Sequence, residues 1–114
     1  MNVLIVDDSR MSRMMLTTII KDAHPDWNIE PAEDGASALA LASANSFDIF
    51  TIDFNMPGIN GLELAEQLKP LFPKAKMALL TANVQDSIQA QAKTLGIDFI
   101  AKPITADKIT AFVG

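Results

Sequence analysis

The sequence contains no cysteine, and this absence excludes several kinds of chemistry at once. Without cysteine, a chain can form neither a disulfide framework nor a thiolate metal site nor a thiol nucleophile. Long apolar runs are also missing. The run Ala38–Ala42 is among the longest, and it is far shorter than the about 20 apolar residues that cross a bilayer. We therefore expect no membrane insertion.

Basic residues are scarce relative to acidic ones. Lysine and arginine together number 9, against 14 aspartates and glutamates, which gives a formal net charge of −5. A surface that binds nucleic acid needs the opposite balance, because lysine and arginine neutralise phosphates. Asp7 and Asp8 follow the first four apolar residues, Val3–Val6, so the start of the sequence lacks the apolar region of a signal peptide. We expect a cytoplasmic protein that binds no nucleic acid directly.

What the sequence does contain is an ordinary globular composition. Of its 114 residues, 49% are hydrophobic and 20% are charged, which suits a chain that buries a core. The length is typical of one domain. A single domain over residues 1–114 is therefore expected.

Short apolar segments alternate along the chain with segments whose apolar residues have helical spacing. Such an alternation predicts βαβ units, and hence a parallel sheet with helices on both faces. The apolar segments are continuous, as expected for strands that are buried on both sides. The prediction is an α/β fold, (βα)₅, with an open doubly wound parallel sheet. The predicted strands are Val3–Val6, Ile29–Ala32, Ile49–Ile52, Met77–Leu80 and Phe99–Ala101.

Individual residues mark where the predicted elements begin and end. Ser9 can cap the first helix, and Gly96 can adopt the left-handed conformation that stops the fourth. Pro70 and Pro73 are expected to end the third helix. Pro31 lies inside the second strand and cannot donate a hydrogen bond to a neighbouring strand, so this strand is expected at an edge of the sheet.

Polar residues follow four of the five predicted strands. They are Asp7 and Asp8 after the first strand, Asp53 after the third, Thr81 after the fourth and Lys102 after the fifth. In open α/β sheets, ligands bind beyond the carboxyl ends of the strands. Crowded carboxylates repel one another unless a cation neutralises them, and Mg²⁺ prefers oxygen ligands. A single aspartate there could be a solvated loop residue, but the whole set predicts a magnesium site, with Lys102 compensating charge when no metal is bound.

These strand ends lie within stretches that resemble the receiver domain of response regulators, a family of two-component phosphorelay signalling. The matches run in the family's order over nearly the whole chain. The resemblance implies a flavodoxin-like sheet with strand order 2-1-3-4-5, in a chemotaxis-type single-domain receiver or the receiver part of a longer chain. The matching stretches are VLIVDDS at 3–9, AEDGA at 32–36, DFNMPGING at 53–61, LTA at 80–82, AKTLG at 92–96 and FIAKP at 99–103.

The resemblance implies a phosphorylation switch. Asp53 would be the nucleophile that accepts a phosphoryl group from a phosphohistidine, on a sensor histidine kinase or a phosphotransfer protein. Asp8, Asp53 and the backbone carbonyl of Asn55 would bind Mg²⁺, and Asp7 would act through a metal-bound water. The protein would catalyse only its own phosphorylation and dephosphorylation, and it would not be a conventional enzyme.

The family also implies how the phosphoryl group is recognised. Lys102 and the Thr81 hydroxyl would neutralise charge on the phosphoryl oxygens. Thr81 and Phe99 would form the coupled switch that changes a partner-binding surface. Many relatives have tyrosine where this chain has Phe99, so no hydrogen bond from a ring hydroxyl can form here. Pro103 would follow Lys102 through a cis peptide bond. The residues that flank the phosphate would be Asn55, Ala82 and Asn83.

Three methionines crowd the first predicted helix. Met11, Met14 and Met15 point in directions too different for all three to face the core. We expect Met15 in the core and at least one of the others exposed. Because exposed methionines adapt to varied partners, Met11 and Met14 are expected where the kinase docks, flanked by Ser12 and Arg13.

Three alternatives remain at this stage. The first is a receiver-like interaction module that works without phosphorylation, although such a module has no need of three crowded carboxylates. The second is a phosphatase of the haloacid-dehalogenase type, which wants a second acid two residues after the nucleophile, where this chain has Asn55. The third is a flavin-binding flavodoxin-like domain, which needs a hydroxyl- and glycine-rich loop in place of Asp7-Asp8-Ser9-Arg10.

Two features depart from the family pattern. Thr51 lies in the central strand, where an aliphatic residue is usual, and the last helix is short. The short helix leaves open whether the surface of the last two helices serves output and dimerisation. We expect a monomer or a weak, phosphorylation-dependent dimer that acts on a downstream protein target.

Overall fold

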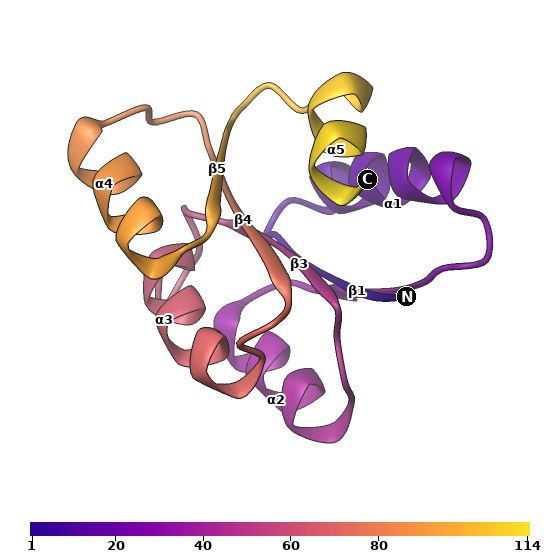
Figure 1. Cartoon of the computed structure of the whole chain (residues 1–114), viewed down its shortest axis with the longest axis horizontal. Coiled ribbons are helices and arrows are strands. Elements are labelled where there is room, and N and C mark those ends of the chain that lie inside the picture. The colour runs from indigo at the N-terminus through magenta and orange to yellow at the C-terminus, as the bar shows by residue number, and fades with distance from the viewer.

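The computed structural model describes residues 1–114 and contains one five-stranded parallel sheet (Figure 1). The strands lie in the order β2-β1-β3-β4-β5. The predicted (βα)₅ fold and its strand order are therefore confirmed. Each strand extends the predicted apolar segment by at most one residue at either end. Their bounds are β1 Asn2–Val6, β2 Asn28–Ala32, β3 Ile49–Asp53, β4 Lys76–Thr81 and β5 Asp98–Ala101.

Helices cover both faces of the sheet. Figure 1 shows α1 and α5 together on one face, and α2, α3 and α4 on the other. None of these helices is long and apolar enough to cross a membrane. Their bounds are α1 Arg10–Ala23, α2 Gly35–Ala44, α3 Gly61–Leu71, α4 Asp86–Leu95 and α5 Ala106–Val113.

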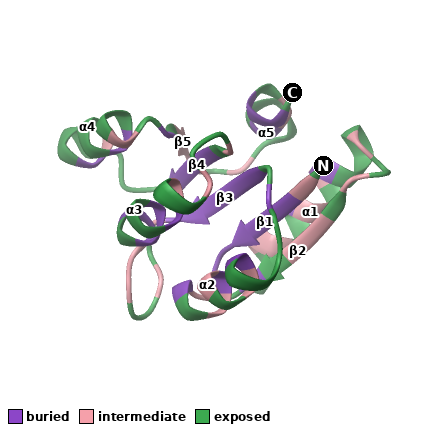
Figure 2. Cartoon of the chain, turned by 60° about the horizontal axis from the view of Figure 1, so that its bottom comes forward, coloured by how far each residue is buried: buried purple, intermediate pink, exposed green.

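The sheet separates two hydrophobic clusters. The larger cluster, of 17 buried residues, lies beneath α2, α3 and α4, and the smaller, of 10, lies beneath α1 and α5. Successive residues of β1 alternate between them, because Leu4 packs into the larger cluster and Ile5 into the smaller. The central strands are therefore buried on both sides, as the continuous apolar segments predict (Figure 2).

Several predicted element ends are confirmed. The Ser9 hydroxyl accepts the Ser12 N–H at the start of α1. Gly96 ends α4 in the left-handed conformation, with φ 76°. Pro31 lies in β2, which is an edge strand. These signals are local, because each residue acts on the element that it borders or in which it lies.

Two expectations were wrong. Pro70 does not end α3 but lies inside it, and the helix continues to Leu71, where the Phe72 N–H still reaches the Leu68 carbonyl at 2.9 Å. Pro70 donates no hydrogen bond of its own, but it is one residue from the end of α3, so little helix follows that it could interrupt. Met15 is not in the core but 42% exposed. The buried side of α1 is set by Leu16, and successive helical residues point about 100° apart.

Candidate functional site at the carboxyl end of the sheet

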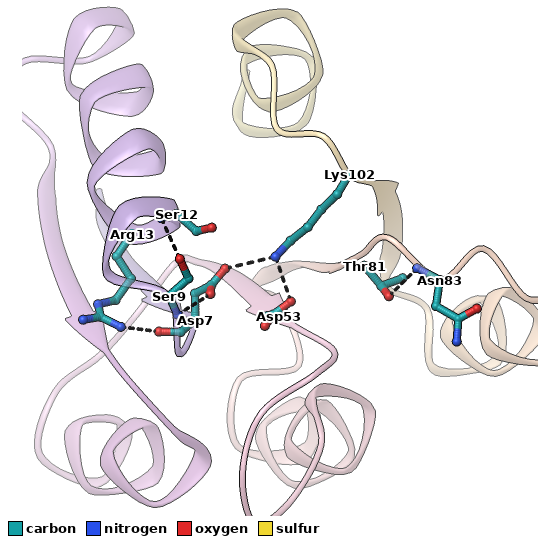
Figure 3. A network of polar contacts seen from close by, with 8 residues as sticks. All are labelled: Asp7, Ser9, Ser12, Arg13, Asp53, Thr81, Asn83 and Lys102. Carbon is teal, nitrogen blue, oxygen red and sulfur yellow. Dashed lines mark hydrogen bonds and ion pairs between the residues drawn. The ribbon is translucent and has the colours of Figure 1, made fainter.

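Four of the predicted site residues meet at one edge of the sheet (Figure 3). Asp53 and Thr81 are the last residues of β3 and β4, while Asp7 and Lys102 directly follow β1 and β5. Parallel strands all point the same way, so their carboxyl ends share this edge. The Lys102 N–H donates to the Thr81 carbonyl at 2.9 Å, which fixes the start of the lysine side chain beside β4.

Lys102 forms ion pairs with two buried carboxylates. Its Nζ lies 3.1 Å from Asp53 Oδ1 and 3.5 Å from Asp7 Oδ2. The lysine side chain is 23% exposed, whereas those of Asp7 and Asp53 are only 1% and 5% exposed. Buried charges are costly unless they are paired, so one ammonium serves two carboxylates here.

The acidic cluster has a composition that suits a hard divalent cation. One carboxylate oxygen from each of Asp7, Asp8 and Asp53 lies within 4.8 Å of the others. Asp7 Oδ2 is buried and has no hydrogen-bond partner, which leaves a lone pair directed into the site. Because every donor is an oxygen, the residues fit Mg²⁺. Asn55 lies two residues beyond Asp53, in the exposed loop before α3.

The surroundings of Asp53 shift its ionisation. Burial raises the pKa of Asp53 to about 6, and the negative charge of Asp7 adds to this rise, while Lys102 opposes it. Burial alone would lower the pKa of Lys102. Its hydrogen bond to Asp53 and the charges of both aspartates outweigh that effect, and the pKa of Lys102 is raised. At neutral pH the site therefore holds an ionised Asp53 that is destabilised relative to an exposed carboxylate.

Thr81 and Phe99 lie on adjacent strands and on the same face of the sheet. Thr81 is fully buried, and its hydroxyl accepts the Asn83 N–H at 3.0 Å. Phe99 pairs in register with Leu79 and packs, half-buried, against the larger cluster. The two side chains thus face the same layer of the molecule. Ala82 and Asn83 are exposed at the rim of the site.

Close packing and a capping box define how α3 begins beside the site. A Cβ on Gly61 would lie only 2.2 Å from the Asp53 carbonyl oxygen, so α3 can approach β3 this closely only because residue 61 is glycine. The Asn60 side chain caps α3, and Glu63 completes the capping box. The peptide bond between Lys102 and Pro103 is cis. Sequence reasoning assigned no role to Gly61, although it ends the DFNMPGING stretch.

The sequence analysis also did not predict the hydrogen bonds that hold Asp7 in place. Asp7 Oδ1 accepts the Ser9 N–H at 2.8 Å, and the Arg13 guanidinium donates to the Asp7 backbone carbonyl (Figure 3). Arg13 was expected only to flank an exposed patch. The sequence does contain a signal for this contact: an arginine lies one turn into the helix that follows the acidic end of the first strand.

Exposed methionines on α1 lie close to the acidic cluster in the chain. Met11 is 73% exposed and Met14 is 61% exposed, which agrees with the expectation that at least one methionine faces solvent. Together with Met15 and Ile19 they border an open hollow of about 690 Å³. This surface begins three residues after Asp8.

A family model for the response regulator receiver domain matches residues 3–114. The chain therefore belongs to the response-regulator receiver family of two-component signalling. The fold and the acidic site described above agree with this assignment.

Relatives of different lengths share this domain. The chemotaxis protein CheY of Listeria monocytogenes is 36% identical over 110 residues, which cover 96% of this chain and 92% of that protein. The cyclic di-GMP phosphodiesterase response regulator RpfG of Xanthomonas campestris is 33% identical over 114 residues, or 97% of this chain, but the match spans only 30% of RpfG. This chain thus corresponds to nearly all of one relative and to less than a third of another.

Solved structures show the same fold. In the complex of CheX, CheY, BeF3 and Mg²⁺ from Borrelia burgdorferi, the matching chain is 28% identical and superposes with a TM-score of 0.89. The match covers 98% of this chain and 85% of that one.

Proposed function

We propose that this receiver domain is a phosphorylation-activated switch and that Asp53 is its phosphoacceptor. One observation carries the proposal: Asp53 ends a central strand, buried, 3.1 Å from the Lys102 ammonium and beside the carboxylates of Asp7 and Asp8. A buried carboxylate crowded by two others has no stabilising purpose in the fold. Its placement suits a carboxylate that accepts a phosphoryl group.

The transfer is a displacement at phosphorus. An oxygen of the Asp53 carboxylate attacks the phosphorus of a phosphohistidine on a sensor histidine kinase or phosphotransfer protein. The new P–O bond forms as the P–N bond breaks, and the imidazole nitrogen leaves with the electron pair. The attacking oxygen must be ionised, and a pKa of about 6 leaves it so at neutral pH. Lys102 then stands beside the added negative charge.

Asp8, Asp53 and the backbone carbonyl of Asn55 would hold Mg²⁺, and Asp7 would act through a bound water. When bound, the cation neutralises charge on the transferring phosphoryl group. Two observations support this assignment: Asp7 Oδ2 accepts no hydrogen bond, and every donor atom of the cluster is an oxygen. The ligands come from the ends of two adjacent strands, so the sheet itself fixes their separation.

The signal leaves through Thr81 and Phe99. In the unphosphorylated protein the Thr81 hydroxyl accepts a hydrogen bond from the Asn83 N–H at 3.0 Å. On phosphorylation this bond breaks, and the hydroxyl turns to donate a hydrogen bond to a phosphoryl oxygen. The Phe99 ring then moves into the space that Thr81 leaves. Asn55, Ala82 and Asn83 border the phosphate. The movement changes the surface that a downstream protein partner recognises.

The kinase or phosphotransfer protein docks on α1 in this proposal. Met11 and Met14 offer it an adaptable apolar surface near the acidic cluster. The protein acts in the cytoplasm as a monomer or a weak phosphorylation-dependent dimer. It catalyses only its own phosphorylation and dephosphorylation, and Lys102 and Thr81 assist both steps.

Intact-mass spectrometry after incubation with acetyl phosphate tests the proposal. The wild type should gain one phosphoryl group in the presence of Mg²⁺ and none in its absence. The Asp53→Asn variant should gain none, because it lacks the attacking carboxylate while keeping the size of the side chain. If the wild type gains no phosphoryl group and also fails to bind beryllofluoride, the domain is a phosphorylation-independent interaction module instead.

A further inference from the structure

Arg13 connects α1 to the end of β1. Its guanidinium Nη1 donates a hydrogen bond to the backbone carbonyl of Asp7, six residues earlier in the chain (Figure 3). The Arg13 side chain is half-buried, unlike that of Arg10, which is exposed one turn earlier on the same helix. Arg10 is therefore exposed to solvent, whereas Arg13 contacts the main chain of the acidic cluster.

The bond replaces a contact that the sheet cannot supply. The Asp7 N–H still pairs with β2, because it donates to the Ala32 carbonyl at 3.0 Å. Ala32 is the last residue of β2, and the chain then turns toward α2, so the strand offers no further N–H to the Asp7 carbonyl. Arg13 supplies that donor. The main chain of Asp7 is thus held at its nitrogen by β2 and at its oxygen by α1.

The side chain of Asp7 is held in turn. Its Oδ1 accepts the Ser9 N–H at 2.8 Å, and its Oδ2 has no hydrogen-bond partner and faces Lys102 at 3.5 Å. With one oxygen occupied, the direction of the free oxygen follows the position of the main chain. Arg13 fixes that position, and Asp8 is the next residue.

We propose that Arg13 is a positioning residue that sets the affinity of the acidic cluster for a divalent cation. The inference rests on the proposed function, since it assumes that the cluster of Asp7, Asp8 and Asp53 binds Mg²⁺. Arg13 also lies next to Met14 in the sequence, so the helix that would receive the kinase carries the group that holds Asp7 in place. Donors that orient metal ligands from behind typically change metal affinity by about 10- to 100-fold when removed.

The sign of the effect separates positioning from simple charge. If Arg13 acted only as a positive charge near the cluster, its removal would reduce repulsion and tighten cation binding. Positioning predicts the opposite, because an unsupported Asp7 carbonyl lets the ligands move apart. Arg10→Ala is the matched control, since it removes the same charge from the same helix without removing a contact to Asp7.

Titration of the folded, unphosphorylated protein with MgCl₂, followed by the NMR signals of the Asp8 and Ser9 amides, tests the proposal. Arg13→Ala should raise the dissociation constant about 10-fold. Arg13→Lys keeps a donor of similar length and should give an intermediate value. Arg10→Ala should bind Mg²⁺ as tightly as the wild type, or slightly more tightly. In the metal-free protein, the Asp8 amide, which shares a peptide group with the Asp7 carbonyl, should already shift more in Arg13→Ala than in Arg10→Ala.

The outcomes separate this inference from the function on which it rests. Unchanged or tighter Mg²⁺ binding by Arg13→Ala, with normal binding by the wild type, overturns the positioning role and leaves the proposed function intact. Absence of saturable Mg²⁺ binding by the wild type overturns both. If Arg13→Ala does not fold, Arg13→Lys decides: weaker binding than the wild type supports the role, and wild-type binding overturns it.

Discussion

Aspartates and lysines lie at both ends of the parallel sheet, in very different surroundings. At the amino end, exposed Asp48 accepts the Asn2 N–H at 2.8 Å, and exposed Lys76 donates to the Phe112 carbonyl at 3.3 Å. At the carboxyl end, Asp7 and Asp53 are buried and share one lysine. At the amino end, these residue types form hydrogen bonds between separate segments of the chain. At the carboxyl end, the same residue types are buried next to like charges.

The difference follows from burial and from the like charge of a neighbouring carboxylate. At the amino end each charged group has a backbone partner and contact with water, so its charge costs little. At the carboxyl end burial and the charge of Asp7 raise the pKa of Asp53. A fold gains nothing in stability from this second arrangement. This arrangement lies at the end of the sheet where we propose that phosphorylation takes place.

Substitution of the lysines should produce the largest contrast between the two ends. Lys102→Ala removes the only cationic side chain paired with Asp53, so phosphorylation by acetyl phosphate should slow by about 100-fold or more. Lys76→Ala removes a lysine of the amino end and should leave the rate unchanged. The rates come from a time course of intact-mass spectra at saturating Mg²⁺. Equal rates in the two variants would remove the functional distinction between the ends.

The second contrast concerns stability and its dependence on pH. The pKa of Asp53 is about 6 in the folded protein against 3.8 as the reference value, so the folded state binds this proton more tightly than the unfolded state. Asp53 therefore costs stability progressively as the pH rises from about 4 to about 6, and the full cost is present at pH 7. Asp53→Asn should therefore raise the free energy of unfolding at pH 7 by about 3 kcal/mol.

Urea unfolding at pH 7 and at pH 4 measures this effect. The advantage of Asp53→Asn should shrink toward zero at pH 4, where the wild-type carboxyl is protonated in the folded state. Asp48→Asn is the control from the amino end, and it should lower stability slightly, by about 1 kcal/mol or less, since it weakens the bond to Asn2. If Asp53→Asn is less stable than the wild type at pH 7, the ionised Asp53 carboxylate does not destabilise the fold.

Thr51 gives the smallest contrast, since it lies between the two ends, inside β3. Its hydroxyl is buried without a hydrogen-bond partner. Thr51→Val removes this unpaired group at nearly constant volume and should stabilise the protein by about 1 kcal/mol without changing phosphorylation. Thr81→Val makes the same change at the carboxyl end and should impair phosphorylation. Urea unfolding and the mass assay together measure both effects, and slower phosphorylation in Thr51→Val would count against confining the chemistry to the strand ends.

Much of the fold could be predicted because its signals are local. Ser9 and Gly96 delimit helices through their own side-chain or backbone chemistry, and Pro31 restricts its strand to an edge of the sheet. The members of the site could be predicted because parallel strands bring their carboxyl ends to one edge. What failed depended on packing: the exposure of Met15 follows from which face of α1 meets the sheet, and Pro70 is tolerated because the last turn closes after it.

The energetics of the site could not be predicted from the sequence, because they depend on burial and on distances in three dimensions. The sequence places Asp7 and Asp53 at neighbouring strand ends, but only their burial and their shared lysine show that the pKa of Asp53 is raised. The same holds for Arg13. The sequence places it one turn into the helix that follows Asp7 and Asp8, but whether the Asp7 carbonyl needs its hydrogen bond depends on where β2 ends.

The decisive experiment locates the phosphoryl group within the chain. After phosphorylation by acetyl phosphate with Mg²⁺, borohydride reduction converts the modified aspartate to homoserine, and peptide mass spectrometry identifies its position. We expect the modification on Asp53 alone, and none on Asp48 at the opposite end or on the adjacent carboxylates of Asp7 and Asp8. Modification of any of these three residues in place of Asp53 would show that Asp53 is not the phosphoacceptor.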